Sequence, residues 1–349
     1  MLTPVTVLTG FLGSGKTTLL NSMLKSPALA DTAVLINEFG SVPIDHLLVR
    51  SSTEQVMVLD SGCICCNVQG DLVQALRDLH FKRAKGEVPT FRRVIIETTG
   101  LADPAPILHT LIQMPVLSAR YSLSGVVTTV DAVHGEAQLS RQFESVKQAA
   151  VADRIVMTKI DQADAATAAR LKARLERLNP TARIFAAVNG DIDPDGLLDT
   201  ALYQTDGRSP DVARWLGMAK FRPVAPARIG SGAPVATAPS HDSDIRTYAL
   251  SFDAPVDFDG LIDGLQMIMT LRGDQLLRMK GIVNARGGER PKVLHAVQHT
   301  LYPDATLPAW PDADRRTRLV FIVRGLEEQF IATTLQHFAA SAPEAAPAT

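Results

Sequence analysis

The stretch that decides the fold lies near the N-terminus and reads Pro4-Val-Thr-Val-Leu-Thr-Gly-Phe-Leu-Gly-Ser-Gly-Lys-Thr17. Its first half predicts a buried strand, and its second half matches G-x-x-x-x-G-K-[ST], with a helix expected from Lys16. Glycines let backbone N–H groups surround phosphate oxygens, and the helix N-terminus adds a positive dipole. The alternative is an ordinary glycine-rich turn. The position after a strand favours a phosphate loop, with Lys16 on the outer phosphates, Thr17 on Mg²⁺, and backbone from Gly10, Gly13, Ser14 and Gly15.

Strands and helices are predicted to alternate over the first 190 residues. Several of the strands are short continuous apolar runs, as expected where helices cover both faces of a sheet. Helices fit between them, for example over 16–25, 70–80 and 163–178. The pattern predicts an α/β P-loop domain with a mostly parallel sheet. The expected strands are 4–8, 33–37, 55–59, 94–97, 125–130, 155–158 and 183–188.

The second half of the chain predicts a smaller α+β domain with an antiparallel sheet. Composition shifts to Pro, Ala, Gly and Ser after residue 221, which is typical of a linker. Strands are then expected over 245–252, 276–283, 292–300 and 318–324, with helices over 258–270 and 326–338. We therefore divide the chain into a P-loop domain (1–221), a linker (222–244), a C-terminal domain (245–340) and a disordered tail (341–349).

Charge and hydropathy exclude several classes of protein. The formal net charge of -2 argues against nucleic acid as the main partner. No apolar run approaches the roughly 20 residues that span a bilayer, and the N-terminus does not have the layout of a signal peptide. We expect a cytoplasmic protein with neither a membrane nor a nucleic-acid partner.

Two further strand ends carry polar residues that suit a nucleotide. Glu97 ends the apolar strand before Thr-Thr-Gly100, where it can serve Mg²⁺ while the Gly100 N–H senses a γ-phosphate. The run Thr158-Lys-Ile-Asp161 follows another buried strand. A carboxylate there accepts from both guanine N1–H and the exocyclic amine, which favours GTP over ATP. Solvated loop charges are the alternative, and Asn189 is a weaker candidate for a loop closing over the base.

All three cysteines lie within four residues, in Gly62-Cys63-Ile-Cys65-Cys66. They are too close together for a disulfide framework, and their thiolates suit Zn²⁺ or another transition metal such as Co²⁺. Adjacent cysteines rarely all reach one ion, so we expect two or three of them plus an outside ligand. Inert buried thiols and a redox pair are the alternatives.

The outside ligand is expected to be Glu38, because it follows another strand that ends at the same edge of the sheet. A solvated loop carboxylate is the alternative interpretation of Glu38. His109 and His46 are lesser candidates, since a lone histidine is more often a surface or core residue than a ligand.

Together these motifs resemble the CobW-like family of metal-linked P-loop GTPases, and most closely its YjiA-like branch. Motifs of the second domain match as well, so that the resemblance covers nearly the whole chain. The matching runs are Gly10-Phe-Leu-Gly-Ser-Gly-Lys-Thr-Thr-Leu-Leu20, Ile36-Asn-Glu-Phe-Gly40, Gly62-Cys-Ile-Cys-Cys66, Glu97-Thr-Thr-Gly-Leu-Ala-Asp-Pro104, Thr158-Lys-Ile-Asp161, Leu277-Arg-Met-Lys-Gly281, His295-Ala-Val-Gln298 and Arg318-Leu-Val-Phe321.

The resemblance implies slow GTP hydrolysis coupled to binding a transition metal and delivering it to a client protein. By position, Gly13 to Thr18 would hold the phosphates and Mg²⁺, and the cysteines with Glu38 would hold the metal. Two departures stand out: the linker has only His241 where many relatives have a histidine-rich stretch, and Thr158 replaces the Asn of many GTPases.

Our hypothesis is that Mg²⁺–GTP orders the segment from Glu38 to Asp45, so that metal affinity depends on the nucleotide. No arginine finger is evident, so turnover should be slow unless a partner or a homodimer completes the site. One alternative is a P-loop ATPase or kinase. The other is a non-hydrolysing, nucleotide-gated zinc-binding regulator.

Overall fold

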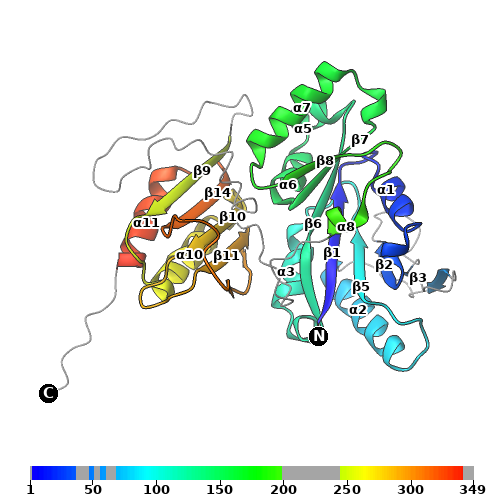
Figure 1. Cartoon of the computed structure of the whole chain (residues 1–349), viewed down its shortest axis with the longest axis horizontal. Coiled ribbons are helices and arrows are strands. Elements are labelled where there is room, and N and C mark those ends of the chain that lie inside the picture. The colour runs from blue at the N-terminus through cyan, green and yellow to red at the C-terminus, as the bar shows by residue number, and fades with distance from the viewer. Residues whose placement is uncertain (1, 37–46, 51–55, 60–67, 199–243, 341–349) are drawn as a thin grey trace. The chain divides into compact units, whose positions relative to one another are not determined.

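The computed structural model describes residues 2–36, 47–50, 56–59, 68–198 and 244–340. They form two compact units, one on each side of residues 199–243 (Figure 1). The expected linker and C-terminal tail lie outside the described residues, except for Asp244, so the proposed domain boundaries stay predictions. Within the described ranges, no helix is both long and apolar enough to cross a membrane.

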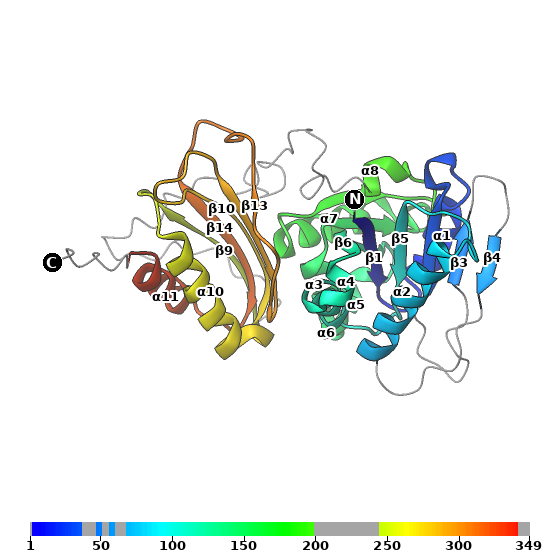
Figure 2. The same cartoon turned by 90° about the horizontal axis from the view of Figure 1, so that it is seen from below.

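An eight-stranded sheet forms the first unit, in the order β4-β3-β2-β5-β1-β6-β7-β8. The six strands from β2 to β8 in that order pair in parallel, whereas β3 and β4 pair antiparallel at one edge (Figure 2). The prediction of a mostly parallel sheet is confirmed. The strands are β1 Thr3–Gly10, β2 Thr32–Ile36, β3 Leu47–Arg50, β4 Val56–Leu59, β5 Arg93–Glu97, β6 Tyr121–Asp131, β7 Arg154–Thr158 and β8 Arg183–Ala186.

Helices cover both faces of this sheet. Consecutive residues of β1 such as Val7 and Leu8, which face opposite sides, are therefore both buried. On one face Leu8 packs with Leu19 of α1 and Leu197 of α8. Helices α3, α4 and α6 also contact the sheet. The helical elements are α1 Lys16–Met23, η1 Pro27–Leu29, α2 Val68–Ala84, α3 Ala105–Gln113, α4 Pro115–Ser118, α5 Gly135–Arg141, α6 Phe143–Val151, η2 Ile160–Gln162, α7 Ala165–Leu178 and α8 Pro194–Leu198.

The second unit is an antiparallel sheet in the order β12-β11-β10-β14-β9, with β13 paired to β11. Its two long helices, α10 and α11, lie on the same face of the sheet (Figure 2). This agrees with the predicted α+β domain. The elements are β9 Ile245–Phe252, α10 Phe258–Arg272, η4 Gly273–Gln275, β10 Leu276–Val283, β11 Lys292–Val297, β12 Thr300–Leu301, β13 Ala305–Thr306, β14 Thr317–Arg324 and α11 Glu328–Ala340.

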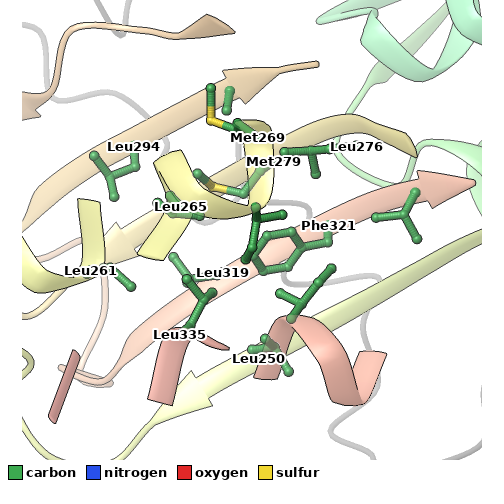
Figure 3. Close-up of a cluster of buried hydrophobic side chains, with 14 of the residues drawn as sticks. Leu250, Leu261, Leu265, Met269, Leu276, Met279, Leu294, Leu319, Phe321 and Leu335 are labelled. Atoms are coloured by element: carbon green, nitrogen blue, oxygen red, sulfur yellow. The ribbon is translucent and has the colours of Figure 1, made fainter. Parts of the chain in front are cut away.

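The core of the second unit lies between its sheet and these two helices. Figure 3 shows Leu265 of α10 and Leu335 of α11 turned toward Phe321 and Met279 of the central strands. Met279 and Phe321 are also cross-strand partners, so helices and strands bury one continuous apolar layer. This core gives the unit its own source of stability.

The structure differs from the predicted strands at two places. The sequence did not predict β3, which pairs antiparallel between β2 and β4. The single strand expected over 292–300 is instead β11 followed by a turn and β12, because Gln298 takes a positive φ of 50°. A left-handed residue breaks an extended strand and lets the chain fold back on itself.

Candidate functional site

The phosphate loop joins β1 to α1 at the carboxyl edge of the parallel sheet. Gly10, Gly13 and Gly15 have positive φ values of 143°, 73° and 87°. A Cβ on Gly10 would also collide with the carbonyl and hydroxyl oxygens of Thr129 on the neighbouring strand β6. Glycine is therefore required both for the backbone path and for close packing on β6.

Lys16 begins α1, and its amine lies against the loop that precedes it. The Nζ donates to the carbonyl oxygens of Gly10 at 2.9 Å and Phe11 at 3.3 Å. The side chain is almost completely buried. A cation held inside a ring of loop backbone is well placed to meet the oxygens of a bound phosphate.

Thr17 and Glu97 join the phosphate loop to the next strand of the sheet. The Thr17 hydroxyl donates to Oε1 of Glu97 at 2.7 Å, and the Glu97 side chain is buried at the end of β5. A hydroxyl and a carboxylate side by side are oxygen ligands of the kind that Mg²⁺ uses beside phosphates. The donor set therefore fits the predicted Mg²⁺ site.

Gly100 lies directly against the phosphate loop. A Cβ at this position would stand 2.7 Å from both the backbone nitrogen and the Cα of Leu12. Only glycine allows the segment after β5 to approach the loop this closely. The structure thus brings the predicted γ-phosphate sensor to the predicted phosphate site.

Thr158, at the end of β7, is tied to the phosphate loop by its hydroxyl. It donates to the carbonyl of Ser14 at 2.7 Å, and the Ser14 hydroxyl in turn bonds that of Thr129 at 2.6 Å. Three adjacent chain segments are therefore connected by short side-chain bonds. Thr158, which stands where many GTPases have Asn, thus links the end of β7 to the phosphate loop.

Next to Thr158, the partly exposed Lys159 forms an ion pair with the buried Asp131. Lys159 has a left-handed backbone, with a φ of 54°, and its Nζ lies 2.8 Å from Oδ2 of Asp131 at the end of β6. Oδ1 of Asp131 accepts from the N–H groups of Val133 at 2.7 Å and His134 at 3.1 Å. Burial alone would raise the pKa of Asp131. The hydrogen bonds from Lys159 and from His134 and Val133 outweigh it and hold the pKa below its ordinary value.

The remaining nucleotide candidates occupy the same part of the unit. Asp161 lies in η2 directly after Lys159 and is exposed. Asn189 has a φ of 51°, and the adjacent Gly190 lies so close to α1 that a Cβ would be 2.8 Å from the carbonyl of Thr18. The turn carrying Asn189 therefore packs on the helix that follows the phosphate loop.

The predicted metal ligands Glu38, Cys63, Cys65 and Cys66, and the lesser candidate His46, lie outside the described residues. His109 is exposed on α3, and no cluster of three potential metal ligands occurs in the described ranges. The structure does describe the strands from which the candidate segments leave. Leu35 of β2 pairs with Leu47 of β3, which pairs with Leu59 of β4.

The register of these strands bears directly on the cysteine segment. Two antiparallel pairings make β4 run parallel to β2, so both strands end at the same edge of the sheet as Glu97, which pairs with Ile36. With strands about 4.8 Å apart, Leu35 and Leu59 are separated by about 10 Å. Glu38 follows Leu35 by three positions and Cys63 follows Leu59 by four, and each such length of chain reaches about 10–14 Å at most.

Sequence reasoning missed two side chains that organise this site. Asp131 ends the apolar run Val126-Val-Thr-Thr-Val130, and a search for acidic residues at strand ends would have found it. Gln148 is a fully buried polar residue on α6 whose carboxamide contacts the segment after Glu97. Its role depends on tertiary contacts, so no local sequence signal marks it.

A glycine-rich G-x-x-x-x-G-K-T loop between a strand and a helix, beside an acidic strand end on a parallel sheet, defines a P-loop nucleotide-binding protein. Comparison with known families specifies the class further. The nucleotide-binding domain of the CobW/HypB/UreG family matches residues 4–186, and the cobalamin synthesis protein cobW C-terminal domain matches residues 245–339. The chain belongs to the CobW/HypB/UreG family.

Relatives match over most of the chain. The zinc chaperone YjiA of Escherichia coli strain K12 is 35% identical over 327 residues, which are 94% of this chain and 96% of that protein. The crystal structure of the Zn(II)-bound YjiA GTPase from E. coli matches with a TM-score of 0.70 at 31% identity, covering 97% of this chain and 99% of that one. A zinc-regulated GTPase metalloprotein activator of Saccharomyces cerevisiae is 30% identical over 58% of this chain and 52% of its own length.

Proposed function

We propose that this protein is a slow GTPase that binds zinc, or another transition metal such as cobalt, and delivers it to a client protein in a manner controlled by GTP. Membership of a family whose relatives include zinc chaperones supports the metal. The position of the Asp161 carboxylate shortly after β7 supports guanine as the base. The single observation that carries the proposal is the register of β2, β3 and β4. This register places the ends of β2 and β4, from which the Glu38 and cysteine segments continue, about 10 Å apart at the edge of the sheet that holds Glu97.

In this proposal the phosphate loop binds the nucleotide. Backbone N–H groups from Gly10 and from Gly13 to Thr18 surround the phosphates, and the Lys16 amine exchanges its carbonyl partners for outer phosphate oxygens. Thr17 and Glu97 would hold Mg²⁺, which neutralises charge on the phosphates when bound. The Gly100 N–H would bond the γ-phosphate, which GDP lacks.

The base-side residues would select guanine. The Asp161 carboxylate would accept from N1–H and the exocyclic amine, while Lys159 is held in place by Asp131. Thr158 would act indirectly through the Ser14 carbonyl, and Asn189 would close over the base from the turn that packs on α1. Adenine offers no matching pair of donors.

The cargo metal would be held by two or three of Cys63, Cys65 and Cys66 together with Glu38. Thiolates with one carboxylate suit a tetrahedral zinc ion, and they require a reducing compartment such as the cytoplasm. GTP binding would order the segment from Glu38 to Asp45 and so change metal affinity. Linkage then requires the metal to change nucleotide affinity by the same factor.

The C-terminal domain of residues 245–340 would present apolar strands to a client, and a homodimer is a further way to complete the GTPase site. A P-loop ATPase or kinase would instead prefer ATP or phosphorylate an acceptor other than water. A non-hydrolysing regulator would bind GTP and leave it intact.

A titration of the reduced protein with zinc and with cobalt, against a competing chelator, tests the proposal. We expect tight binding that is lost when Cys65 and Cys66 are both replaced by Ser, and retained in the matched control His109→Ala. A GTP and ATP hydrolysis assay on the same samples separates the alternatives. Metal binding that is unchanged in the cysteine variant would overturn the proposed metal site.

A further inference from the structure

A side chain of helix α6 holds the segment that follows Glu97 by hydrogen bonds. This residue lies outside all of the nucleotide-binding motifs. Gln148 is 0% exposed, and its Nε2 donates to the carbonyl of Gly100 at 3.2 Å and to that of Ala102 at 3.0 Å. These two carbonyls flank Leu101, whose side chain is 54% exposed. One buried carboxamide therefore holds the backbone of a turn whose side chain faces solvent.

The orientation of the carboxamide follows from its neighbours. Two carbonyl oxygens face the Nε2 of Gln148, and a flipped amide would place Oε1 against both of them. Oε1 is itself buried and makes no hydrogen bond with the described residues. The two donated bonds therefore satisfy the buried Nε2, which would be costly to leave unpaired.

A second contact from the same helix holds the same segment. Lys147, the neighbour of Gln148, makes an ion pair with Asp103 at 2.7 Å. The helix is itself fixed to the sheet, since the Thr128 hydroxyl of β6 donates to the backbone carbonyl of Gln148 at 2.8 Å. The contacts that hold residues 100–103 therefore come from a helix that is itself hydrogen-bonded to the central sheet.

The opposite side of the segment faces the phosphate loop. The position of a Cβ on Gly100 is only 2.7 Å from the backbone of Leu12, so Gly100 is confined between the loop and Gln148. The N–H of Gly100 belongs to the preceding peptide, whose Thr99 carbonyl accepts from the Ala102 N–H at 3.2 Å. Because Gln148 bonds the carbonyls of both Gly100 and Ala102, it holds this turn and so fixes the direction of the Gly100 N–H before any ligand arrives. Preorganised donors of this kind bind an incoming anion without a cost of reordering.

We propose that Gln148 is a positioning residue that holds Gly100 for the γ-phosphate and so sets the preference for GTP over GDP. This inference rests on the proposed function, in which the Gly100 N–H bonds a group that only GTP carries. Gln148 does not touch the nucleotide. Its loss should weaken binding of a GTP analogue and leave GDP binding nearly unchanged.

The test is the ratio of the dissociation constants for GDP and for a non-hydrolysable GTP analogue, both measured with Mg²⁺ by fluorescence. The variant Gln148→Met keeps the length of the side chain and removes both donors. We expect the preference for the GTP analogue to fall by about tenfold, equivalent to about 1.4 kcal/mol, as for the loss of one or two buried hydrogen bonds.

Asn179 supplies the matched control, because it is also 0% exposed and donates from its amide to carbonyls of the same helix region. Its Nδ2 bonds the carbonyls of Ala149, Ala150 and Ala152, each at 2.9 Å, away from the segment after Glu97. Asn179→Leu should lower the melting temperature and leave the GTP-to-GDP preference within twofold of the wild type.

An unchanged preference in folded Gln148→Met, or a parallel loss of GDP and GTP-analogue affinity, would overturn the inference. If that variant does not fold, the variant Lys147→Met tests the inference instead. The ion pair of Lys147 with Asp103 is partly exposed, so we expect its removal to preserve the fold. We expect a loss of preference of about threefold there, and no loss would overturn the inference. Wild-type protein that binds no GTP analogue would overturn the proposed function itself, and this inference with it.

Discussion

The hydroxyl of Thr17 donates a hydrogen bond to Oε1 of Glu97 at 2.7 Å, which joins two residues 80 positions apart. The bond crosses from the first turn of α1 to the end of β5, which is the neighbour of β1 in the sheet. The two predicted Mg²⁺ ligands are therefore already adjacent and oriented toward each other.

Replacing Glu97 by Gln should reduce GTP turnover by about two orders of magnitude, because the neutral amide no longer supplies charge at the Mg²⁺ site. The Mg²⁺ concentration for half-maximal activity should rise. Steady-state phosphate release over a Mg²⁺ series measures both quantities. Glu87→Gln is the control, since Glu87 makes only an exposed ion pair with Lys85 at 3.6 Å. Normal Mg²⁺ dependence in Glu97→Gln would remove this residue from the metal site.

Replacing Asp161 by Asn should exchange guanine for xanthine specificity. The amide can donate to the C2 carbonyl of xanthine, whereas it no longer accepts from both guanine donors. We expect GDP affinity to fall by at least about tenfold and XDP to become the tighter ligand. Asp164→Asn is the control, because Asp164 caps α7 through the Thr167 N–H at 2.8 Å. Unaltered GDP binding by the Asp161 variant would argue against guanine recognition at this position.

Replacing Asp131 by Asn should weaken GDP and GTP-analogue binding together, by about fivefold to tenfold, because Lys159 loses its buried carboxylate partner. The equal loss distinguishes Asp131 from Gln148, whose effect is confined to GTP. Asp153→Asn is the matched control at the other end of β7, where Asp153 accepts from the Val126 N–H at 3.0 Å. Different losses for the two nucleotides would contradict a role in base-side positioning.

Asp131 should also make stability depend on pH. Its pKa is lowered in the folded protein, against burial that would raise it, chiefly by the Lys159 hydrogen bond and then by those from His134 and Val133. A lowered folded pKa contributes stability that is present above the unfolded value near 3.9 and lost as the pH falls through the folded value. The difference in melting temperature between wild type and Asp131→Asn should therefore be full at pH 7 and shrink below about pH 4. A constant difference would mean that the carboxylate charge is not what stabilises the pair.

The parts of the site that the sequence predicted are those in which chemistry demands fixed local spacing. The phosphate loop requires its glycines, Lys16 and Thr17 within one short loop. Glu97 ends an apolar strand and Asp161 lies shortly after another, and both strands are visible in the sequence. Family resemblance covered both units, and the match over residues 4–186 and 245–339 confirms it. The strand β3 was missed because four apolar-rich residues without alternation give no clear period.

The bonds that fix these motifs in place could not be predicted, because they join residues far apart in the chain. Thr158 reaches the Ser14 carbonyl across 144 positions, and Gln148 reaches Gly100 across 48. Such contacts depend on which strands become neighbours in the sheet. A polar residue in a helix pattern, such as Gln148, looks like an exposed residue until the segment packed on it is known.

The most direct test of the central claim is the zinc dissociation constant of the reduced wild-type protein, measured once with a bound GTP analogue and once with GDP. The proposed coupling predicts values that differ by about fivefold or more, and a change of the same factor in the nucleotide preference when zinc is added. Equal zinc affinities in the two nucleotide states would contradict GTP control of metal delivery.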